Sequence, residues 1–122
     1  MRDLLAVMKA LGDENRLRIV AALEERELCL CQLVELLGLA TSTVSRHASI
    51  LQQARLIEAR KQGRWTYFRL DEEAPEVAKD AAALVIRALS RDRQGRDDRK
   101  RLARILKTDP EELCRKQSEC KC

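Results

Sequence analysis

The sequence predicts a small, mainly helical domain that carries one β-hairpin. Apolar residues recur at helical spacing over most of the chain, whereas the segment from Ile57 to Leu70 changes to strand-like spacing and is divided by a turn at Gly63. With 122 residues and 45% hydrophobic content, the chain is long enough for one modest core. Its formal net charge of +4 permits nucleic-acid binding without requiring it.

Four helices are expected before the hairpin. Gly12 and Gly38 are natural stops for the first and third helices, Asp13 is an N-cap for the second, and Thr41 or Ser42 caps the fourth. The apolar positions that define the four helices are Leu4, Leu5, Met8 and Leu11, then Leu17, Val20, Ala21 and Leu23, then Cys31, Val34 and Leu37, and finally Val44, Ala48 and Leu51.

Strands are expected at 57–60 and 65–70, joined by a turn at 61–64. Pro75 then opens a helix whose narrow apolar seam suits pairing with another helix. Leu102, Ile105 and Leu106 indicate one more short helix, which residues 110–113 could continue. The last residues, 114–122, are polar and are expected to be frayed. This order is that of a winged helix-turn-helix, which predicts a DNA-binding and dimerisation domain at 1–90 and a charged, cysteine-containing C-terminal helix and tail at 91–122.

The fourth helix and the hairpin are the candidate DNA-reading elements. Short hydroxyl side chains and an arginine lie opposite the apolar stripe, as a helix in the major groove requires, and Arg60, Lys61 and Arg64 are expected at the tip of the hairpin. A solvated helix face and a charged edge hairpin are the structural alternatives. The candidate DNA contacts are Ser42, Thr43, Ser45, Arg46, His47, Ser49, Gln53, Arg60, Lys61 and Arg64. His47, the one histidine, is interpreted first as a hydrogen-bonded structural residue and second as a DNA contact.

Cys29 and Cys31 lie at the start of the third helix and are candidate ligands for a thiophilic metal. A helix N-terminus lowers a thiol pKa, which favours the thiolate in both. On a regular helix the two side chains point roughly 200° apart, so one ion can join them only if the helix start unwinds. The alternative is that both are small buried apolar residues. Three further cysteines, Cys114, Cys120 and Cys122, could complete this site from either subunit, or form a separate site.

Several segments together resemble the ArsR/SmtB family of metal-responsive winged-helix repressors, over about residues 1–89. Residues 12–19 are similar to the opening of the family's second helix, 42–47 to its recognition helix and 63–70 to its wing. The most specific match is Glu27–Leu33, which resembles the arsenite-sensing signature.

The resemblance implies a non-enzymatic repressor that leaves double-stranded operator DNA when As(III), or Sb(III), binds the cysteines. It also implies a homodimer, formed by the N-terminal helix and the helix after the wing. The chain departs from the family in three places. Val34 stands where the best-known arsenite sensors have a third cysteine, Asp80 is unaccompanied by the histidines of a zinc site, and Ala48 replaces a usual leucine.

Two other functions remain as alternatives. The first is a repressor of the same fold that responds to thiol oxidation, and the second is a thiol-rich metal-binding buffer protein. An arsenate reductase is disfavoured because no phosphate-cradling loop and no nucleophile–base arrangement is visible. The N-terminal apolar run lacks a signal-peptide pattern and no membrane-spanning segment is visible, so we expect a cytoplasmic protein with reduced thiols.

Overall fold

The computed structural model describes residues 1–119, which form seven helices and a three-stranded sheet. The helices are α1 (Arg2–Ala10), α2 (Glu14–Ala22), α3 (Leu30–Leu37), α4 (Thr41–Gln53), α5 (Glu76–Ser90), α6 (Arg93–Ile105) and α7 (Pro110–Glu119). The strands are β1 (Leu28–Cys29), β2 (Ile57–Gln62) and β3 (Trp65–Leu70). The mainly helical class with a β-hairpin is therefore confirmed.

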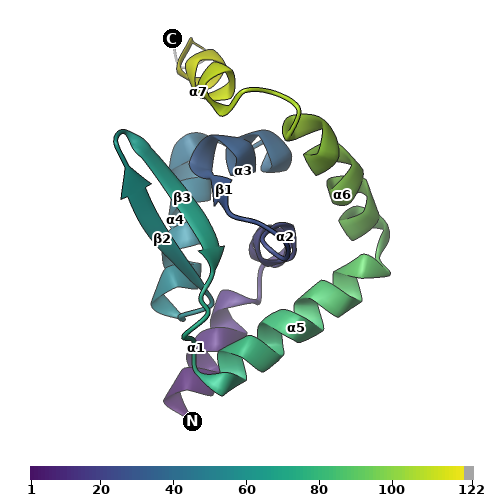
Figure 1. Ribbon diagram of the computed structural model, residues 1–122. Coiled ribbons are helices and arrows are strands. Elements are labelled where there is room, and N and C mark those ends of the chain that lie inside the picture. The colour runs from purple at the N-terminus through teal and green to yellow at the C-terminus, as the bar shows by residue number, and fades with distance from the viewer. Residues whose placement is uncertain (120–122) are drawn as a thin grey trace.

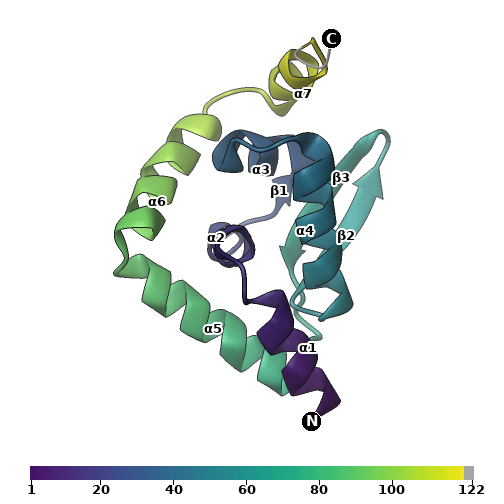
Figure 2. The same ribbon diagram turned by 180° about the vertical axis from the view of Figure 1, so that it is seen from behind.

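Helix α2 lies near the centre of the fold, and α4, α5 and α6 pack around it (Figure 1). Seen from behind, α4 and the hairpin occupy one side of α2, while α6 occupies the other (Figure 2). Helix α1 crosses the lower end, where it packs on α4 and α5. The α3–α4 pair and the hairpin therefore lie together on the outside of the fold, as in a winged helix-turn-helix.

The sheet has the strand order β1-β3-β2, and both pairings are antiparallel. Strand β2 extends to Gln62, which pairs with Trp65, so the turn is shorter than predicted and consists of Gly63 and Arg64. Strand β1 was not predicted because two residues carry no readable periodicity. It places Cys29 opposite Tyr67 and so joins the start of α3 to the wing.

Most of the apolar positions predicted for α2, α3 and α4 lie in the core, whereas Leu17, Ala21 and Cys31 are only partly buried. The predicted positions with at most 7% exposure are Val20, Leu23, Val34, Leu37, Val44, Ala48 and Leu51. Helix α1 differs, since Leu4, Leu5 and Met8 are 41–52% exposed, and Leu84 of α5 is 53% exposed. These four side chains are the exposed apolar residues that α1 and α5 present. No helix among residues 1–119 is long and apolar enough to cross a membrane.

Two of the predicted helix ends are confirmed and one is wrong. The Asp13 carboxylate accepts hydrogen bonds from the backbone N–H groups of Asn15 (2.8 Å) and Arg16 (3.2 Å). Gly38 ends α3 with a positive φ of 67°, a conformation that glycine adopts at low cost. Helix α4 already includes Thr41 and has Ala40 as its N-cap, so neither Thr41 nor Ser42 is the cap.

The C-terminal region is more ordered than predicted. Asp92 caps α6 by accepting a hydrogen bond from the Gln94 backbone (2.8 Å), and this helix includes most of the densely charged run. The expectation of a frayed segment from Cys114 is wrong as far as Glu119, because α7 packs on α3 through Leu113, which is 5% exposed. Cys120 and Cys122 lie outside the described residues.

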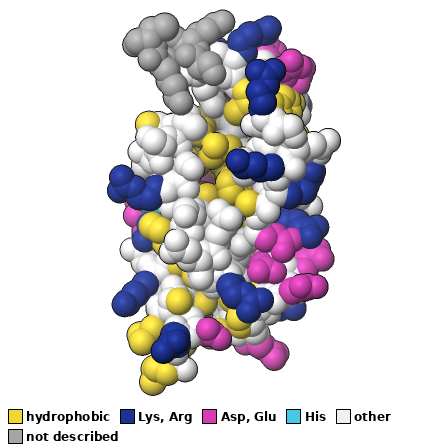
Figure 3. All heavy atoms as spheres, turned by 90° about the vertical axis from the view of Figure 1, so that its left-hand side faces the viewer, with side chains coloured by type: hydrophobic (Ala, Val, Ile, Leu, Met, Phe, Trp, Pro, Cys, Tyr) yellow, Lys and Arg dark blue, Asp and Glu magenta, His cyan; other side chains and the backbone are white. Residues whose placement is uncertain are grey.

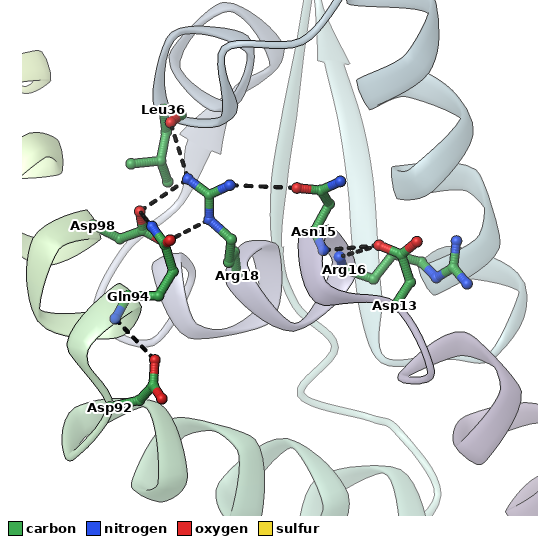
Figure 4. A network of polar contacts seen from close by, with 8 residues as sticks. All are labelled: Asp13, Asn15, Arg16, Arg18, Leu36, Asp92, Gln94 and Asp98. Atoms are coloured by element: carbon green, nitrogen blue, oxygen red, sulfur yellow. Dashed lines mark hydrogen bonds and ion pairs between the residues drawn. The ribbon is translucent and has the colours of Figure 1, made fainter.

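A buried ion pair holds α6 against α2 and α3 (Figure 4). The Arg18 guanidinium donates to both carboxylate oxygens of Asp98 at 2.8 and 3.0 Å, and each side chain is only 12% exposed. Arg18 also reaches the Leu36 carbonyl at 3.4 Å, and Gln94 donates to Asp98 at 2.9 Å. One arginine of α2 therefore links the end of α3 to the C-terminal helices.

Candidate nucleic-acid interface and cysteine site

Helix α4 turns its predicted contact residues toward solvent. Its core side is apolar and its outer side is polar, which is the division that a recognition helix needs. Arg46 is exposed and forms no ion pair with any other residue in the range 1–119. The exposed candidates on this helix are Ser42, Thr43, Ser45, Arg46, Ser49 and Gln53.

His47 is half-buried and faces α2 instead of open solvent. Its Nδ1 atom lies 3.0 Å from Nη1 of Arg16, whose Nε atom donates to the carbonyl of Ala10. Since an arginine only donates, Nδ1 of His47 is the acceptor in this contact. The first interpretation of His47, as a hydrogen-bonded structural residue, agrees with this geometry.

Arg60 does not lie at the tip of the wing, as the sequence interpretation assumed. It lies opposite Tyr67 within the strands, and its guanidinium stacks over that ring with 4.6 Å to the centroid. It also donates two hydrogen bonds to the Glu27 carboxylate, at 2.6 and 2.8 Å. The hydrogen bond from Arg60 lowers the pKa of Glu27. Lys61 and Arg64 are exposed, so they remain the cations that the wing presents.

Figure 3 shows the side of the molecule that carries the hairpin. Lys and Arg side chains are spread along the length of this face, whereas Asp and Glu side chains gather mainly toward the right-hand margin and the lower end (Figure 3). Hydrophobic side chains appear at the lower end, where the N-terminus lies in Figure 1. A polyanion approaching α4 and the wing therefore meets dispersed positive charge.

Cys29 is the N-cap of α3 and is not part of the helix. It has extended backbone angles, belongs to β1 and is 1% exposed. The Gln32 side chain accepts a hydrogen bond from the Cys29 backbone N–H at 2.9 Å, while the Cys29 sulfur faces the Gln32 N–H. The spacing of Cys29 and Gln32 is that of a capping box, which is the sequence signal that would have located this cap.

The predicted lowering of the Cys29 pKa is wrong. Burial raises the pKa of the Cys29 thiol, and the backbone N–H groups of Gln32 and Cys31 offset this effect only in part. Desolvation outweighs the helix terminus because the thiol is enclosed by core residues. Cys29 is therefore held mainly as a neutral thiol at neutral pH.

Cys31 lies on the first turn of α3 and is joined to Cys114 of α7 by a disulfide, with the two Cα atoms 5.4 Å apart. The Gln117 side chain donates to the Cys31 carbonyl at 2.8 Å. The structure thus brings one of the three C-terminal cysteines to the predicted site. No three His, Cys, Asp or Glu side chains within 1–119 are arranged to hold a metal ion.

The fold and this surface define the class of the protein: a winged helix-turn-helix that presents α4 and a basic wing. Residues 13–59 match the family described as bacterial regulatory protein, arsR family. The chain is 34% identical over 87 residues to the arsenic resistance transcriptional regulator ArsR2 of Pseudomonas putida, and covers 74% of that protein. The chain belongs to the arsR family, which consists of transcriptional regulators and not of enzymes.

A second relative is the arsenical resistance operon repressor of Escherichia coli, 40% identical over 75 residues. That match includes 61% of this chain and 64% of the repressor, so the chain spans less than two thirds of that relative. Among solved structures, the homodimeric winged helix-turn-helix DNA-binding domain Mb0332 of Mycobacterium bovis is similar, with a TM-score of 0.62 and 29% identity. The match covers 71% of this chain and 79% of that one. These likenesses confirm the resemblance and the winged-helix fold.

Proposed function

We propose that this protein is a homodimeric repressor that leaves its operator DNA when As(III) binds cysteine thiolates at the start of α3. The observation that carries the proposal is the position of the two cysteines at the start of the helix-turn-helix, with Cys29 as the N-cap of α3 and Cys31 on its first turn. The same two residues adjoin the wing through β1. A ligand there acts on both DNA-reading elements at once. Sb(III), which has similar coordination chemistry, is the second inducer we expect.

The DNA-bound state uses α4 in the major groove and the wing on phosphates. Arg46 is the residue of α4 best suited to a base edge or phosphate, because its guanidinium is exposed and has no internal ion pair among residues 1–119. Lys61 and Arg64 supply the phosphate contacts. We assign Arg60 to positioning, since its hydrogen bonds to Glu27 hold β2 against the segment before β1.

The exposed apolar surface of α1 and α5 supports the homodimer. Leu4, Leu5, Met8 and Leu84 are each 41–53% exposed, and contact of such large apolar side chains with a second surface removes apolar area from water. A second copy of the chain would cover them and would place two α4 helices for two half-sites. Leu5→Asp should convert the dimer to a monomer, as measured by light scattering after size exclusion.

Release of the DNA would begin at Cys29, the N-cap of α3. For As(III) to join Cys29 and Cys31, the Cys29 thiol must turn out of the core, which breaks its contact with the Gln32 N–H and moves β1 away from β3. The helix-turn-helix and the wing then lose their relative position. A preference of about 3 kcal/mol for the DNA-free form weakens DNA binding ~150-fold.

A thiol-redox repressor is a second candidate, and the Cys31–Cys114 disulfide favours it. Oxidation ties α7 to the start of α3, whereas reduction frees both thiols. Peroxide or diamide without any metalloid would trigger this second mechanism. The metal-buffer alternative predicts thiol ligands without DNA affinity, so the exposed polar face of α4 argues against it.

The test is anisotropy of a fluorescent duplex that the reduced protein has selected from a random library. We expect tight binding that arsenite abolishes, in the presence of a phosphine reductant, which does not compete as a thiol. The Cys29→Ser/Cys31→Ser protein should bind the duplex and ignore arsenite, while Cys120→Ser/Cys122→Ser should behave as the parent. Unchanged release from the Cys29→Ser/Cys31→Ser protein would refute the site, and release by diamide alone would transfer the trigger to oxidation.

A further inference from the structure

We propose that Cys114 of the same chain is the third thiolate of the As(III) site, which makes α7 a ligand-bearing arm docked on α3. This inference rests on the proposed function and assigns the ligand that Val34 cannot supply. Trivalent arsenic takes three thiolates, and Cys29 and Cys31 provide two. The third thiolate comes from α7, a helix that the sequence pattern did not predict beyond Leu113.

The docking of α7 does not depend on the disulfide alone. Leu113, adjacent to Cys114, is 5% exposed and packs with Leu36 and Ile105, which are 0% and 5% exposed. Cys31 borders this same apolar cluster. One helical turn beyond Leu113, the Gln117 side chain donates to the Cys31 carbonyl at 2.8 Å. Packing on one side and a hydrogen bond on the other therefore hold Cys114 at Cys31 after the sulfur–sulfur bond is reduced.

The separation of the two backbones suits a shared ligand. The Cα atoms of Cys31 and Cys114 are 5.4 Å apart, and their side chains point toward each other, as the disulfide requires. Both residues are partly exposed, whereas Cys29 is 1% exposed. A metalloid arriving from solvent therefore meets the Cys31–Cys114 pair first. Cys29 joins last, when it leaves its position as the cap of α3.

The chemistry is ligand exchange without any change of oxidation state. Arsenous acid, As(OH)3, loses its three hydroxyls as three water molecules while three As–S bonds form, and the three thiol protons leave with the water. Arsenic stays trivalent and no electron is transferred. Formation of the Cys31–Cys114 disulfide consumes two of the three ligands, so only the reduced protein can bind.

Two cysteine-pair variants test the assignment without DNA. The first, Cys29→Ser/Cys120→Ser/Cys122→Ser, keeps only Cys31 and Cys114. The second, Cys114→Ser/Cys120→Ser/Cys122→Ser, keeps only Cys29 and Cys31. Phenylarsine oxide is the probe, because its arsenic takes two thiolates and releases one water molecule. Binding is measured by intact mass and by protection of the thiols from Ellman's reagent, with circular dichroism to confirm that each variant is folded.

We expect the Cys31–Cys114 protein to bind one phenylarsine oxide, because these two side chains already face each other. The Cys29–Cys31 protein should bind at least ~100-fold more weakly, because its binding-competent form requires the buried Cys29 thiol to leave the core and is rarely populated. For arsenite itself, Cys114→Ser should weaken binding by a similar factor, and the Cys120→Ser/Cys122→Ser control should not. Gln117→Ala should weaken binding less than Cys114→Ser, because it only positions the arm.

Equal phenylarsine oxide affinity in the two pair variants, or full arsenite affinity in Cys114→Ser, would overturn the assignment of Cys114 and leave the proposed function standing. Loss of arsenite binding in Cys120→Ser/Cys122→Ser alone would transfer the third ligand to those residues. If the parent protein binds no arsenite when reduced, both the proposed function and this inference fail.

Discussion

The α4–wing side of the fold and the α6–α7 side use their polar residues differently. On α4 the polar side chains other than His47 point mainly outward, and Arg46 has no ion pair among residues 1–119. On the opposite side, polar groups are used for internal contacts: Arg18 with Asp98, and Gln117 with Cys31. The α4–wing side is therefore left available for a partner, whereas the α6–α7 side holds α3 in place.

The largest effect on stability should come from breaking the ion pair between Arg18 and Asp98 on the α6–α7 side. Asp98→Ala leaves the Arg18 guanidinium buried without its partner, which should lower the free energy of unfolding by about 3 kcal/mol. Urea denaturation followed by circular dichroism measures this change. The matched control is Asp97→Ala, an exposed neighbour whose loss should change stability by less than about 0.5 kcal/mol. Equal changes in the two variants would show that the ion pair does not hold α6.

The next largest effect should be a loss of DNA affinity, without loss of stability, when α4 is changed. Arg46→Ala should weaken duplex binding by about 1–3 kcal/mol, because one arginine contact to a base edge or phosphate is lost, and should leave the urea midpoint unchanged. Anisotropy and denaturation of the same protein provide the two readings. A loss of stability with intact DNA affinity would show that Arg46 supports the fold and does not contact DNA.

The free energy of unfolding should depend on pH through Cys29, which lies where α3 meets the wing. Burial raises the pKa of this thiol in the folded protein, so the folded state retains the proton that the unfolded state loses as pH rises through about 9. The stabilising contribution is therefore complete below that pH and is lost above it, with a slope of at most about 1.4 kcal/mol per pH unit. Urea denaturation of the reduced protein and of Cys29→Ala at pH 8 and 10 isolates the contribution of Cys29. Parallel losses in both proteins would contradict it.

The smallest effect concerns the end of α4. Arg55 has a positive φ of 62°, which costs a residue with a side chain about 1 kcal/mol. Its guanidinium recovers part of this through a hydrogen bond to the Glu73 carbonyl at 3.1 Å. Arg55→Gly should therefore stabilise the fold slightly, by about 0.5 kcal/mol, as measured by the thermal midpoint. A lower midpoint would mean that the bond to Glu73 outweighs the backbone strain.

The sequence predicted the parts whose signals are local. The Asp13 cap, the Gly38 stop and the apolar stripe of α4 are short-range patterns, and the structure confirms them. It did not predict β1, because this two-residue strand depends on a partner strand far along the chain, where Phe68 lies 40 positions beyond Leu28. It also missed most of α7, since only Leu113 and Cys114 mark the side of this polar helix that packs on α3. The raised pKa of Cys29 was not predicted because burial depends on the whole core.

Strand β1 has a consequence for how the protein behaves in solution. It is short, yet it covers the backbone groups of β3 at Tyr67 and Phe68 that would otherwise form an open sheet edge. Uncovered strand edges pair readily with other chains. Under the proposed release mechanism, displacement of Cys29 from β1 exposes a site for self-association next to the wing. If that mechanism holds, the arsenite-bound protein should be the form most prone to aggregate at high concentration.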